Sequence, residues 1–240
     1  MSHPLDGIMS SSSHRAWKIA TTIASRRSFY LAGGTGLAIH LHHRRSTDLD
    51  FFVHDDFDPQ EILNELQSAK LSVAVTHLSS GTLNVLCDSV LVQFLSVIGQ
   101  MQLSPTSRID TADVAAIPDI LAMKLNAVTG RAKLRDYFDL MVVDQQTGYP
   151  IEHGFQLFLQ RYHPAVPDQA VATLIRSLGY LDDVEDDLTV PVERKRIVEF
   201  WNSRSVEAAK YIDRNGISVF RQRIEQNPGQ PGMRFRKGMR

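Results

Sequence analysis

The sequence of 240 residues contains one cysteine, Cys87, and no long apolar run. A single cysteine cannot form a disulfide within the chain, which excludes a disulfide-rich extracellular scaffold and suits the reducing cytoplasm. Cys87 lies in an alternating apolar segment, a pattern that favours a buried small residue over a nucleophile. No uncharged apolar stretch approaches the roughly 20 residues that a membrane-spanning helix needs. Residues 1–13 lack the features of a signal peptide, so we expect a cytoplasmic protein with no membrane partner.

Strong charge and metal-binding clusters are also missing. The formal net charge is −1, so any contact with nucleic acid has to be local rather than spread over a basic surface. His40, His42 and His43 lack the i, i+4 spacing of a helical metal pair, and no cysteine cluster accompanies them. These patterns argue against structural zinc.

The apolar periodicity predicts an α+β fold, with one mixed sheet followed by a helical region. The elements expected first are a helix at 14–27, a strand at 29–32, a helix at 35–43, a strand at 47–53, a helix from 58 and a three-stranded meander at 71–98. After residue 100 the strand signal largely stops, and helices are expected from 118, at 132–145, 151–162, 168–178, 191–202 and 203–212. We therefore expect an α/β core at 1–105, a helical lobe at 106–225 and a flexible basic tail at 226–240.

A glycine turn and two aspartates form the most informative pattern in the chain. Gly33 and Gly34 precede Thr35 at an expected helix start, where backbone amides can approach phosphates closely. Thirteen residues separate Gly34 from Asp48, enough for one helix and a turn into a strand. On that strand Asp48 and Asp50 share one face, because side chains alternate. Oxygen ligands of this kind suit Mg²⁺, which leaves further positions for phosphate and water.

Lys124 lies within an otherwise apolar helix, where a charge is costly unless it is paired or faces a polar cleft. It is expected to act as a point charge on a phosphate, the alternative being an ordinary ion pair or a solvent-exposed ammonium. Asp136 could anchor Lys124 or lie beside the metal site. Asp139 could form an ordinary surface ion pair with Arg135 at i, i+4. The alternative is that Asp136 and Asp139 border a buried side, because the apolar residues 140–143 follow them.

Two further charged segments have alternative interpretations. Arg44 and Arg45, just before the acidic strand, could bind a phosphate or base, or could neutralise Asp48 and Asp50. The acidic run at 182–187 is expected to be a solvated loop or helix start, with a second metal site as the weaker alternative.

Four segments together resemble a known family of nucleotidyltransferases. The glycine turn and the two aspartates are similar to the signature of the DNA polymerase beta-like nucleotidyltransferase superfamily. The order of segments narrows the resemblance to the AbiEii/AbiGii-type nucleotidyltransferase toxins, and these segments are Leu31–Leu37, Arg44–Phe52, Ile117–Ala127 and Lys133–Leu140. The resemblance runs from Tyr30 to Gln145 and, more loosely, through Ser177–Asp183.

The resemblance implies a Mg²⁺-dependent enzyme that transfers a nucleotide from an NTP and releases pyrophosphate. It implies a catalytic sheet and a helical lobe that closes the nucleotide cleft. The family includes toxins of toxin–antitoxin pairs, with transfer RNA among the acceptors, so an RNA or protein acceptor and a cognate antitoxin are the expected partners. The implied nucleotide-binding residues are Gly33, Gly34, Thr35, Arg45 and Lys124; the implied catalytic residues are Asp48, Asp50, Lys124 and Asp136, of which Asp48 and Asp50 bind the metal.

One position departs from the superfamily pattern. Many polymerase beta-like enzymes carry a third carboxylate on a later strand, where it helps to activate the attacking hydroxyl. The counterpart here is Gln93, whose amide cannot act as a base or as a strong metal ligand. The alternative function is therefore a catalytically weakened nucleotide-binding or regulatory protein, and a further alternative is an interaction domain on an inactive scaffold.

Overall fold

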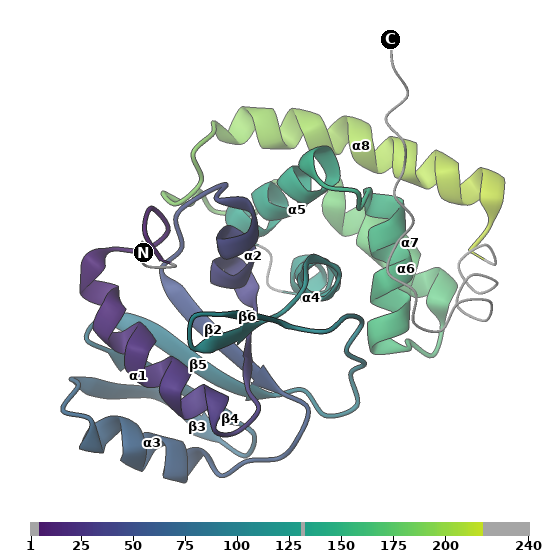
Figure 1. Ribbon diagram of the computed structural model, residues 1–240. Helices are drawn as coiled ribbons and strands as arrows, with labels where there is room; N and C mark the ends of the chain where they lie inside the picture. Colours follow the sequence, from purple (N-terminus) through teal and green to yellow (C-terminus); the bar gives the residue numbers. More distant parts are fainter. Residues whose placement is uncertain (1–4, 131–132, 218–240) are drawn as a thin grey trace. The chain divides into compact units, whose positions relative to one another are not determined.

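A computed structural model describes residues 5–130 and 133–217 of the chain. The predicted basic tail at 226–240 lies outside these residues. The chain divides into two compact units (Figure 1). The first runs to Gln100 and includes Pro105–Ile120; the second contains Met101–Ser104 and the described residues from Leu121 onward. The predicted domain limits at residues 105 and 225 stay predictions.

The first unit is built on a mixed sheet whose order within the described residues is β3-β4-β5-β2-β1-β7-β6. Its strands are β1 (Tyr30–Leu31), β2 (Asp48–Val53), β3 (Val73–Ser79), β4 (Thr82–Cys87), β5 (Val90–Ser96), β6 (Ser107–Ile109) and β7 (Ala112–Val114). The pairs β2–β5 and β1–β7 are parallel and the others are antiparallel. The predicted mixed sheet is confirmed, as is the meander formed by β3, β4 and β5.

The hairpin of β6 and β7 was not predicted, and it is the exception, among the described residues, to the expectation that strands largely stop after residue 100. Each strand has only three residues, too few for an alternating pattern to be visible. The strand β7 owes its place to pairing with β1, which lies more than 80 positions earlier in the chain. Long-range pairing of this kind leaves no local signal.

The helices α1 (His14–Ser25) and α3 (Pro59–Ser68) of the first unit pack on the apolar face of the sheet (Figure 1). A short 3₁₀ turn, η1 (Ser11–Ser13), precedes α1. The α3 helix begins as its sequence predicts, because Asp58 accepts a hydrogen bond from the amide of Gln60 and Pro59 takes the first helical position. Four fully buried or nearly fully buried sheet residues meet these helices: Leu49, Phe51, Val92 and Phe94.

Alternation along β2 sends every second side chain to the other face. Leu49, Phe51 and Val53 are buried, whereas Asp48 and Asp50 are half-buried. Strand β4 alternates in the same way and ends at Cys87, which is fully buried as predicted. Burial, assisted by the charge of Asp88, raises the pKa of the Cys87 thiol to about 11.

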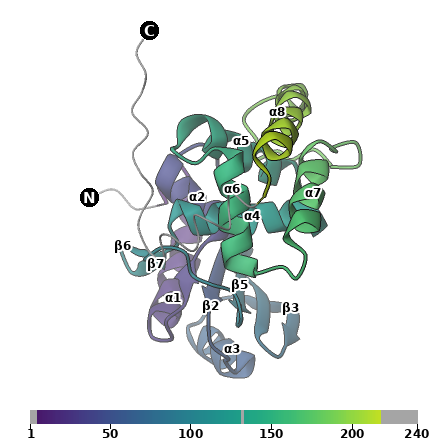
Figure 2. The ribbon, with the colours of Figure 1, turned by 90° about the vertical axis from the view of Figure 1, so that its right-hand side faces the viewer.

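The second unit is helical. The α4 helix (Ile117–Gly130) carries the chain into it, and α5 (Leu134–Gln146), α6 (Ile151–Tyr162), α7 (Pro167–Leu178) and α8 (Arg194–Asn215) follow. The α8 helix lies against α5, α6 and α7 (Figure 2). Arg204 on α8 forms ion pairs with Asp144 on α5 at 3.0 Å and with Glu152 on α6 at 2.6 Å. Burial alone would raise the pKa of Glu152, but hydrogen bonds from Arg204 lower it.

The prediction of two helices at 191–202 and 203–212 is wrong, because α8 is continuous. No glycine or proline separates the two expected halves. The buried residues Ile197, Trp201, Ser205 and Ala208 continue one helical stripe across the expected break. The indole of Trp201 also donates a hydrogen bond of 3.0 Å to the carbonyl of Tyr137, which fixes the middle of α8 to α5.

Candidate nucleotide and metal site

The glycine turn lies at the first residues of α2 (Gly33–Leu41) in the first unit. Gly33 has a φ of +61°, a conformation that favours glycine, and Ala32 before it has no side chain that could cap the helix. The first amides of a helix have no partner within that helix, and its N-terminus carries partial positive charge. This turn therefore has the geometry of an anion-binding helix start.

The carboxylate of Asp50 lies directly against this turn. A Cβ atom built on Gly33 would overlap Oδ2 of Asp50, so only glycine leaves room for the carboxylate here. The structure thus brings together two parts of the predicted site that lie 17 positions apart. A metal held by Asp50 would lie beside the atoms that can hold a phosphate.

Arg44 occupies the space beside the second glycine. A Cβ atom on Gly34 would lie 2.5 Å from a guanidinium nitrogen of Arg44. The Arg44 side chain is nearly buried, and it donates a hydrogen bond of 2.7 Å to the carbonyl of Arg45. Arg45 itself is exposed. Of the two arginines considered from the sequence, Arg44 is the one beside the turn.

The spacing of Arg44 carried a signal that sequence reasoning did not use. Arg44 and Ser46 precede Asp48 and Asp50 at intervals of two, so an extended chain presents all four on one side. Ser46 is buried too. This alternation places Arg44 on the side of the two aspartates and Arg45 on the opposite side.

Thr35 holds the glycine helix to the acidic strand. Its side chain is fully buried; its hydroxyl lies 2.8 Å from the hydroxyl of Ser46 and hydrogen-bonds to the backbone carbonyl of Asp48. The hydroxyl therefore has partners within the protein. Its evident effect is to fix the start of α2 against the start of β2.

The donor set suits Mg²⁺ better than a metal that needs a complete protein cage. Asp48 is half-buried and accepts a hydrogen bond of 3.0 Å from the hydroxyl of Thr47. Among the described residues no group of three or more acidic, histidine or cysteine side chains could hold a metal ion. Two carboxylates, with phosphate oxygens and water as the remaining ligands, are a usual arrangement for Mg²⁺. Asp48 and Asp50 fit this ion.

Gln93 is the residue beside Asp50 on the neighbouring strand. In the parallel pair of β2 and β5, Asp50 is in register with Gln93, so both side chains lie on the same face. Asn84 on β4 is in register with Gln93 in turn. The position next to Asp50 therefore carries an amide and no carboxylate.

Lys124 lies in the second unit between two acidic side chains of α5. Its Nζ is 2.6 Å from Oδ1 of Asp136 and 2.8 Å from Oδ2 of Asp139. Asp136 therefore does anchor Lys124, one of the alternatives left by the sequence. Its other oxygen accepts a hydrogen bond from the amide of Lys133, which helps to start α5.

Of the two interpretations of Asp139, the surface ion pair is wrong and the position on a buried side is confirmed, because its side chain is fully buried. The i, i+4 spacing to Arg135 suggested a solvated pair. Arg135 instead lies 3.7 Å from Asp187. The fact that α4 supplies a buried lysine to this face of α5 is tertiary information, which helix spacing cannot provide.

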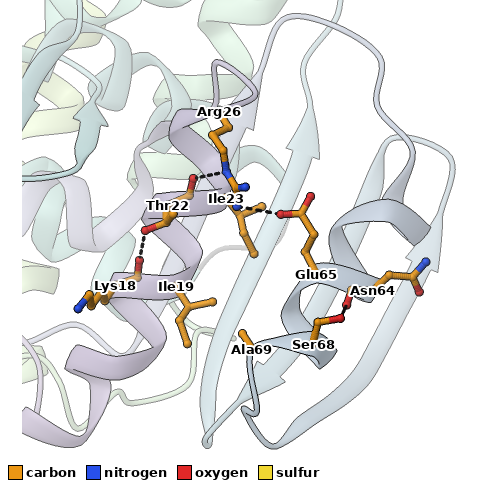
Figure 3. Close-up of a pocket in the computed structure, with 9 residues that line it drawn as sticks. All are labelled: Lys18, Ile19, Thr22, Ile23, Arg26, Asn64, Glu65, Ser68 and Ala69. Atoms are coloured by element: carbon orange, nitrogen blue, oxygen red, sulfur yellow. Dashed lines mark hydrogen bonds and ion pairs between the residues drawn. The ribbon is translucent and has the colours of Figure 1, made fainter.

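Two cavities lie outside these residues. One of about 540 Å³ lies between α1 and α3, and Figure 3 shows bonds among several of the polar groups drawn around it, such as Arg26 to Glu65 and Ser68 to the carbonyl of Asn64. The other, of about 600 Å³, lies in the second unit beside part of the acidic run, which forms a loop as predicted. Neither cavity contains Asp48, Asp50 or the glycine turn.

Comparisons with known proteins show what the chain is similar to. Residues 18–83 match the family described as "Nucleotidyl transferase AbiEii toxin, Type IV TA system". An uncharacterized protein of Aquifex aeolicus (strain VF5) is 28% identical over 185 residues, which cover 75% of this chain and 87% of that protein. No helix among the described residues is both long and apolar enough to cross a membrane.

A solved structure shares the fold. The crystal structure of a "putative nucleotidyltransferase from H. pylori" aligns with a TM-score of 0.52 at 16% identity, and the alignment covers 85% of this chain and 95% of that one. The nucleotidyltransferase toxin MenT4 from Mycobacterium tuberculosis H37Rv aligns over 92% of this chain and 90% of its own, at 14% identity and a lower TM-score of 0.45. The family match includes the glycine turn, Asp48 and Asp50. The resemblance seen in the sequence is thus confirmed: residues 18–83 match the AbiEii nucleotidyltransferase toxins, and the chain has a nucleotidyltransferase fold.

Proposed function

We propose that this protein is a Mg²⁺-dependent nucleotidyltransferase that transfers a nucleotide from an NTP to an RNA, with transfer RNA as the first candidate, or to a protein acceptor. We further propose that it acts in the cytoplasm as the toxin of a toxin–antitoxin pair, with a cognate antitoxin as partner. The observation that carries the proposal is the contact of Asp50 with Gly33. That contact sets a metal-binding carboxylate beside a helix start suited to phosphate.

The phosphates of the NTP would lie at the start of α2. The backbone amides after Gly33 would donate hydrogen bonds to them, and the guanidinium of Arg44 beside Gly34 would add positive charge. Arg45, exposed at the same segment, is retained as a candidate contact to the nucleotide. Thr35 would keep the amides and the acidic strand in fixed positions.

Asp48 and Asp50 would hold the metal through their carboxylate oxygens. The bound Mg²⁺ would supply charge stabilisation for the transferred phosphoryl group and the leaving pyrophosphate. Alternation on β2 sets both carboxylates on the same face while Leu49 and Phe51 anchor the strand from the other. The strand thus fixes their direction without further loops.

Lys124 and Asp136 are proposed as the residues of the second unit that serve the reaction. Within that unit, Asp136 would hold the ammonium of Lys124 in place through the 2.6 Å ion pair. Asp139, fully buried on the other side of Lys124, joins Asp136 in that positioning.

The amide of Gln93 favours one alternative function. A carboxylate at this position could accept the proton of the attacking hydroxyl, and an amide cannot. The alternative is a protein that binds nucleotides for regulation and transfers nothing. It predicts that NTP raises the melting temperature without any turnover.

The decisive experiment measures transfer of label from each of four α-labelled NTPs to total RNA, to protein and to the enzyme itself. The expected result is Mg²⁺-dependent labelling that EDTA abolishes, and that Asp48→Asn and Asp50→Asn reduce by about a thousandfold or more. The matched control is Asp56→Asn, which changes an exposed acid three positions beyond β2 and should keep full activity.

The outcomes separate the proposals. Wild-type protein that binds NTP with Mg²⁺ but labels no acceptor would support the regulatory alternative. Equal activity of Asp50→Asn and Asp56→Asn would contradict the site. Growth arrest on expression, absent for Asp50→Asn and relieved by the co-expressed antitoxin, is the expected result for a toxin.

A further inference from the structure

A row of polar side chains crosses the sheet from the metal aspartate toward its edge. The register pairs Asp50 of β2 with Gln93 of β5, and Gln93 with Asn84 of β4. Residues paired in this way point to the same face, with Cβ atoms of neighbours about 5 Å apart. Gln93 and Asn84 therefore follow Asp50 in a straight line on the face opposite the apolar core.

The surroundings of this row make its polarity unusual. The row on one side pairs Phe52 with Leu95 and Leu95 with Thr82, and the row on the other pairs Asp48 with Leu91 and Leu91 with Leu86. Two adjacent amides thus interrupt apolar side chains of β4 and β5. Leu86 is 38% exposed, so part of this apolar surface is accessible.

Asn84 has an unsatisfied hydrogen-bond acceptor. Its Oδ1 atom is buried and has no hydrogen-bond partner among the described residues. A buried polar atom without a partner costs free energy, and native proteins contain few of them. A side chain kept in this state is explained when a ligand supplies the missing donor.

We propose that Gln93 and Asn84 form the subsite for the terminal nucleotide of an RNA acceptor. The inference rests on the proposed transferase function. Gln93, one strand from the carboxylate of Asp50, is within reach of a hydroxyl that attacks a phosphate at the metal. Its amide binds that hydroxyl by a hydrogen bond and takes no proton from it. Asn84, one strand further, binds the same nucleotide through its base.

The chemistry of the two amides favours RNA over a protein acceptor. A serine, threonine or tyrosine side chain offers a single hydroxyl, which one amide satisfies. A nucleotide offers ribose hydroxyls together with a base edge that has both donors and acceptors, which is what Asn and Gln side chains match. The accessible leucine surface beside the row suits a base that is not stacked in a helix.

The test uses the full-length protein in two measurements. The first is the anisotropy of a fluorescent RNA oligonucleotide with a free 3′ hydroxyl, without NTP. The second is labelled transfer, with KM determined separately for RNA and for the preferred NTP. Gln93→Met and Asn84→Leu should each weaken RNA binding and raise the RNA KM by about five- to tenfold. The KM for NTP should stay within about twofold, because the glycine turn and both aspartates are unchanged.

The matched control is Thr82→Val, which removes a hydroxyl on the same face of β4 but in the row of Phe52. It should leave both KM values unchanged. Gln93→Glu adds a structural check: its carboxylate should give the transfer rate a new dependence on pH in the acidic range, which a residue with only a packing role would not do.

The results distinguish failure of this inference from failure of the proposed function. Suppose that the wild-type protein transfers label, and that in Gln93→Met and Asn84→Leu the KM values for RNA and NTP change together or do not change. This result would overturn the subsite and leave the transferase function standing. If both variants weaken RNA binding and the wild-type protein transfers no label, the subsite is supported and the transferase function is overturned. Labelling of protein but not RNA would overturn the choice of acceptor.

Discussion

The two faces of strands β2 and β5 carry different side chains and serve different purposes. On one face Leu49, Phe51 and Phe94 are almost completely buried, and the rings of Phe51 and Phe94 stack with centroids 5.3 Å apart. On the other face Asp48, Asp50 and Gln93 are half-buried beside a glycine turn. The same backbone alternation produces both faces.

This difference shows how packing on one face of a strand can hold the carboxylates on its other face in fixed directions. Carboxylates grouped near each other repel, and a flexible loop would let them separate. On β2, Asp50 lies between the buried residues Leu49 and Phe51, and Asp48 directly precedes Leu49, so the core fixes the direction of both carboxylates. Mutations on the apolar face should therefore act on stability, and mutations on the polar face on activity.

The largest expected effect is on transfer activity, when a carboxylate on the polar face is replaced by a neutral amide. Asp50→Asn should lower labelled transfer by about a thousandfold or more, while the free energy of unfolding changes by less than about 1 kcal/mol. Steady-state kinetics and urea unfolding measure the two quantities. A variant that loses activity only because it unfolds would break the comparison.

The next effect comes from the apolar face of the neighbouring strand. Phe94→Ala should lower the free energy of unfolding by about 3–5 kcal/mol, because it removes a ring packed against Phe29 and Phe51. The control is Leu95→Ala, the next residue on the opposite and less buried face, which should cost clearly less. Equal losses for the two variants would show that the faces do not differ in this way.

A moderate effect is expected where the glycine turn meets the polar face. Gly33→Ala adds a Cβ in the space of the Asp50 carboxylate and forces alanine into a positive φ. Transfer should fall about 10- to 100-fold, and stability by about 1–2 kcal/mol. Gly148→Ala, where a Cβ meets nothing within 4 Å, should change neither. Full activity of Gly33→Ala would mean that the contact with Asp50 has no functional role.

The smallest effect concerns the thiol on the apolar face. Since burial raises the pKa of Cys87 to about 11, only the unfolded state ionises near pH 9. The thiol's contribution to stability is complete below the unfolded pKa and is lost as pH rises toward the folded value. Between pH 7 and pH 9.5 the wild-type protein should lose about 1 kcal/mol more than Cys87→Ala. Identical pH profiles of the two proteins would contradict deep burial of the thiol.

Local patterns predicted the parts of the fold that depend on neighbouring residues. The start of α3 follows from Asp58 and Pro59, and the common face of Asp48 and Asp50 follows from alternation. Pairings between distant segments could not be predicted in this way. The hairpin of β6 and β7 depends on β1, and the burial of Asp139 depends on a lysine from α4.

The candidate site shows the same division. Glycine, aspartate and their spacing pointed to the residues that the structure brings together, and the position of Gln93 next to Asp50 agrees with the strand chosen from the sequence. The choice between Arg44 and Arg45 as nucleotide contact required knowing which side of the segment faces the turn. The packing of Arg44 over Gly34 supplied that information, and the alternation of Arg44 and Ser46 with the two aspartates agrees with it.

The central claim is that the turn at Gly33 and the carboxylates of Asp48 and Asp50 bind one ligand together. Titration calorimetry with a non-hydrolysable NTP analogue tests it directly, in Mg²⁺ and in EDTA, for the wild-type protein and Asp48→Asn/Asp50→Asn. The account predicts binding of one equivalent that weakens strongly when either Mg²⁺ or the carboxylates are removed. Equal affinity in all four titrations, or no binding to the wild-type protein in Mg²⁺, would contradict it.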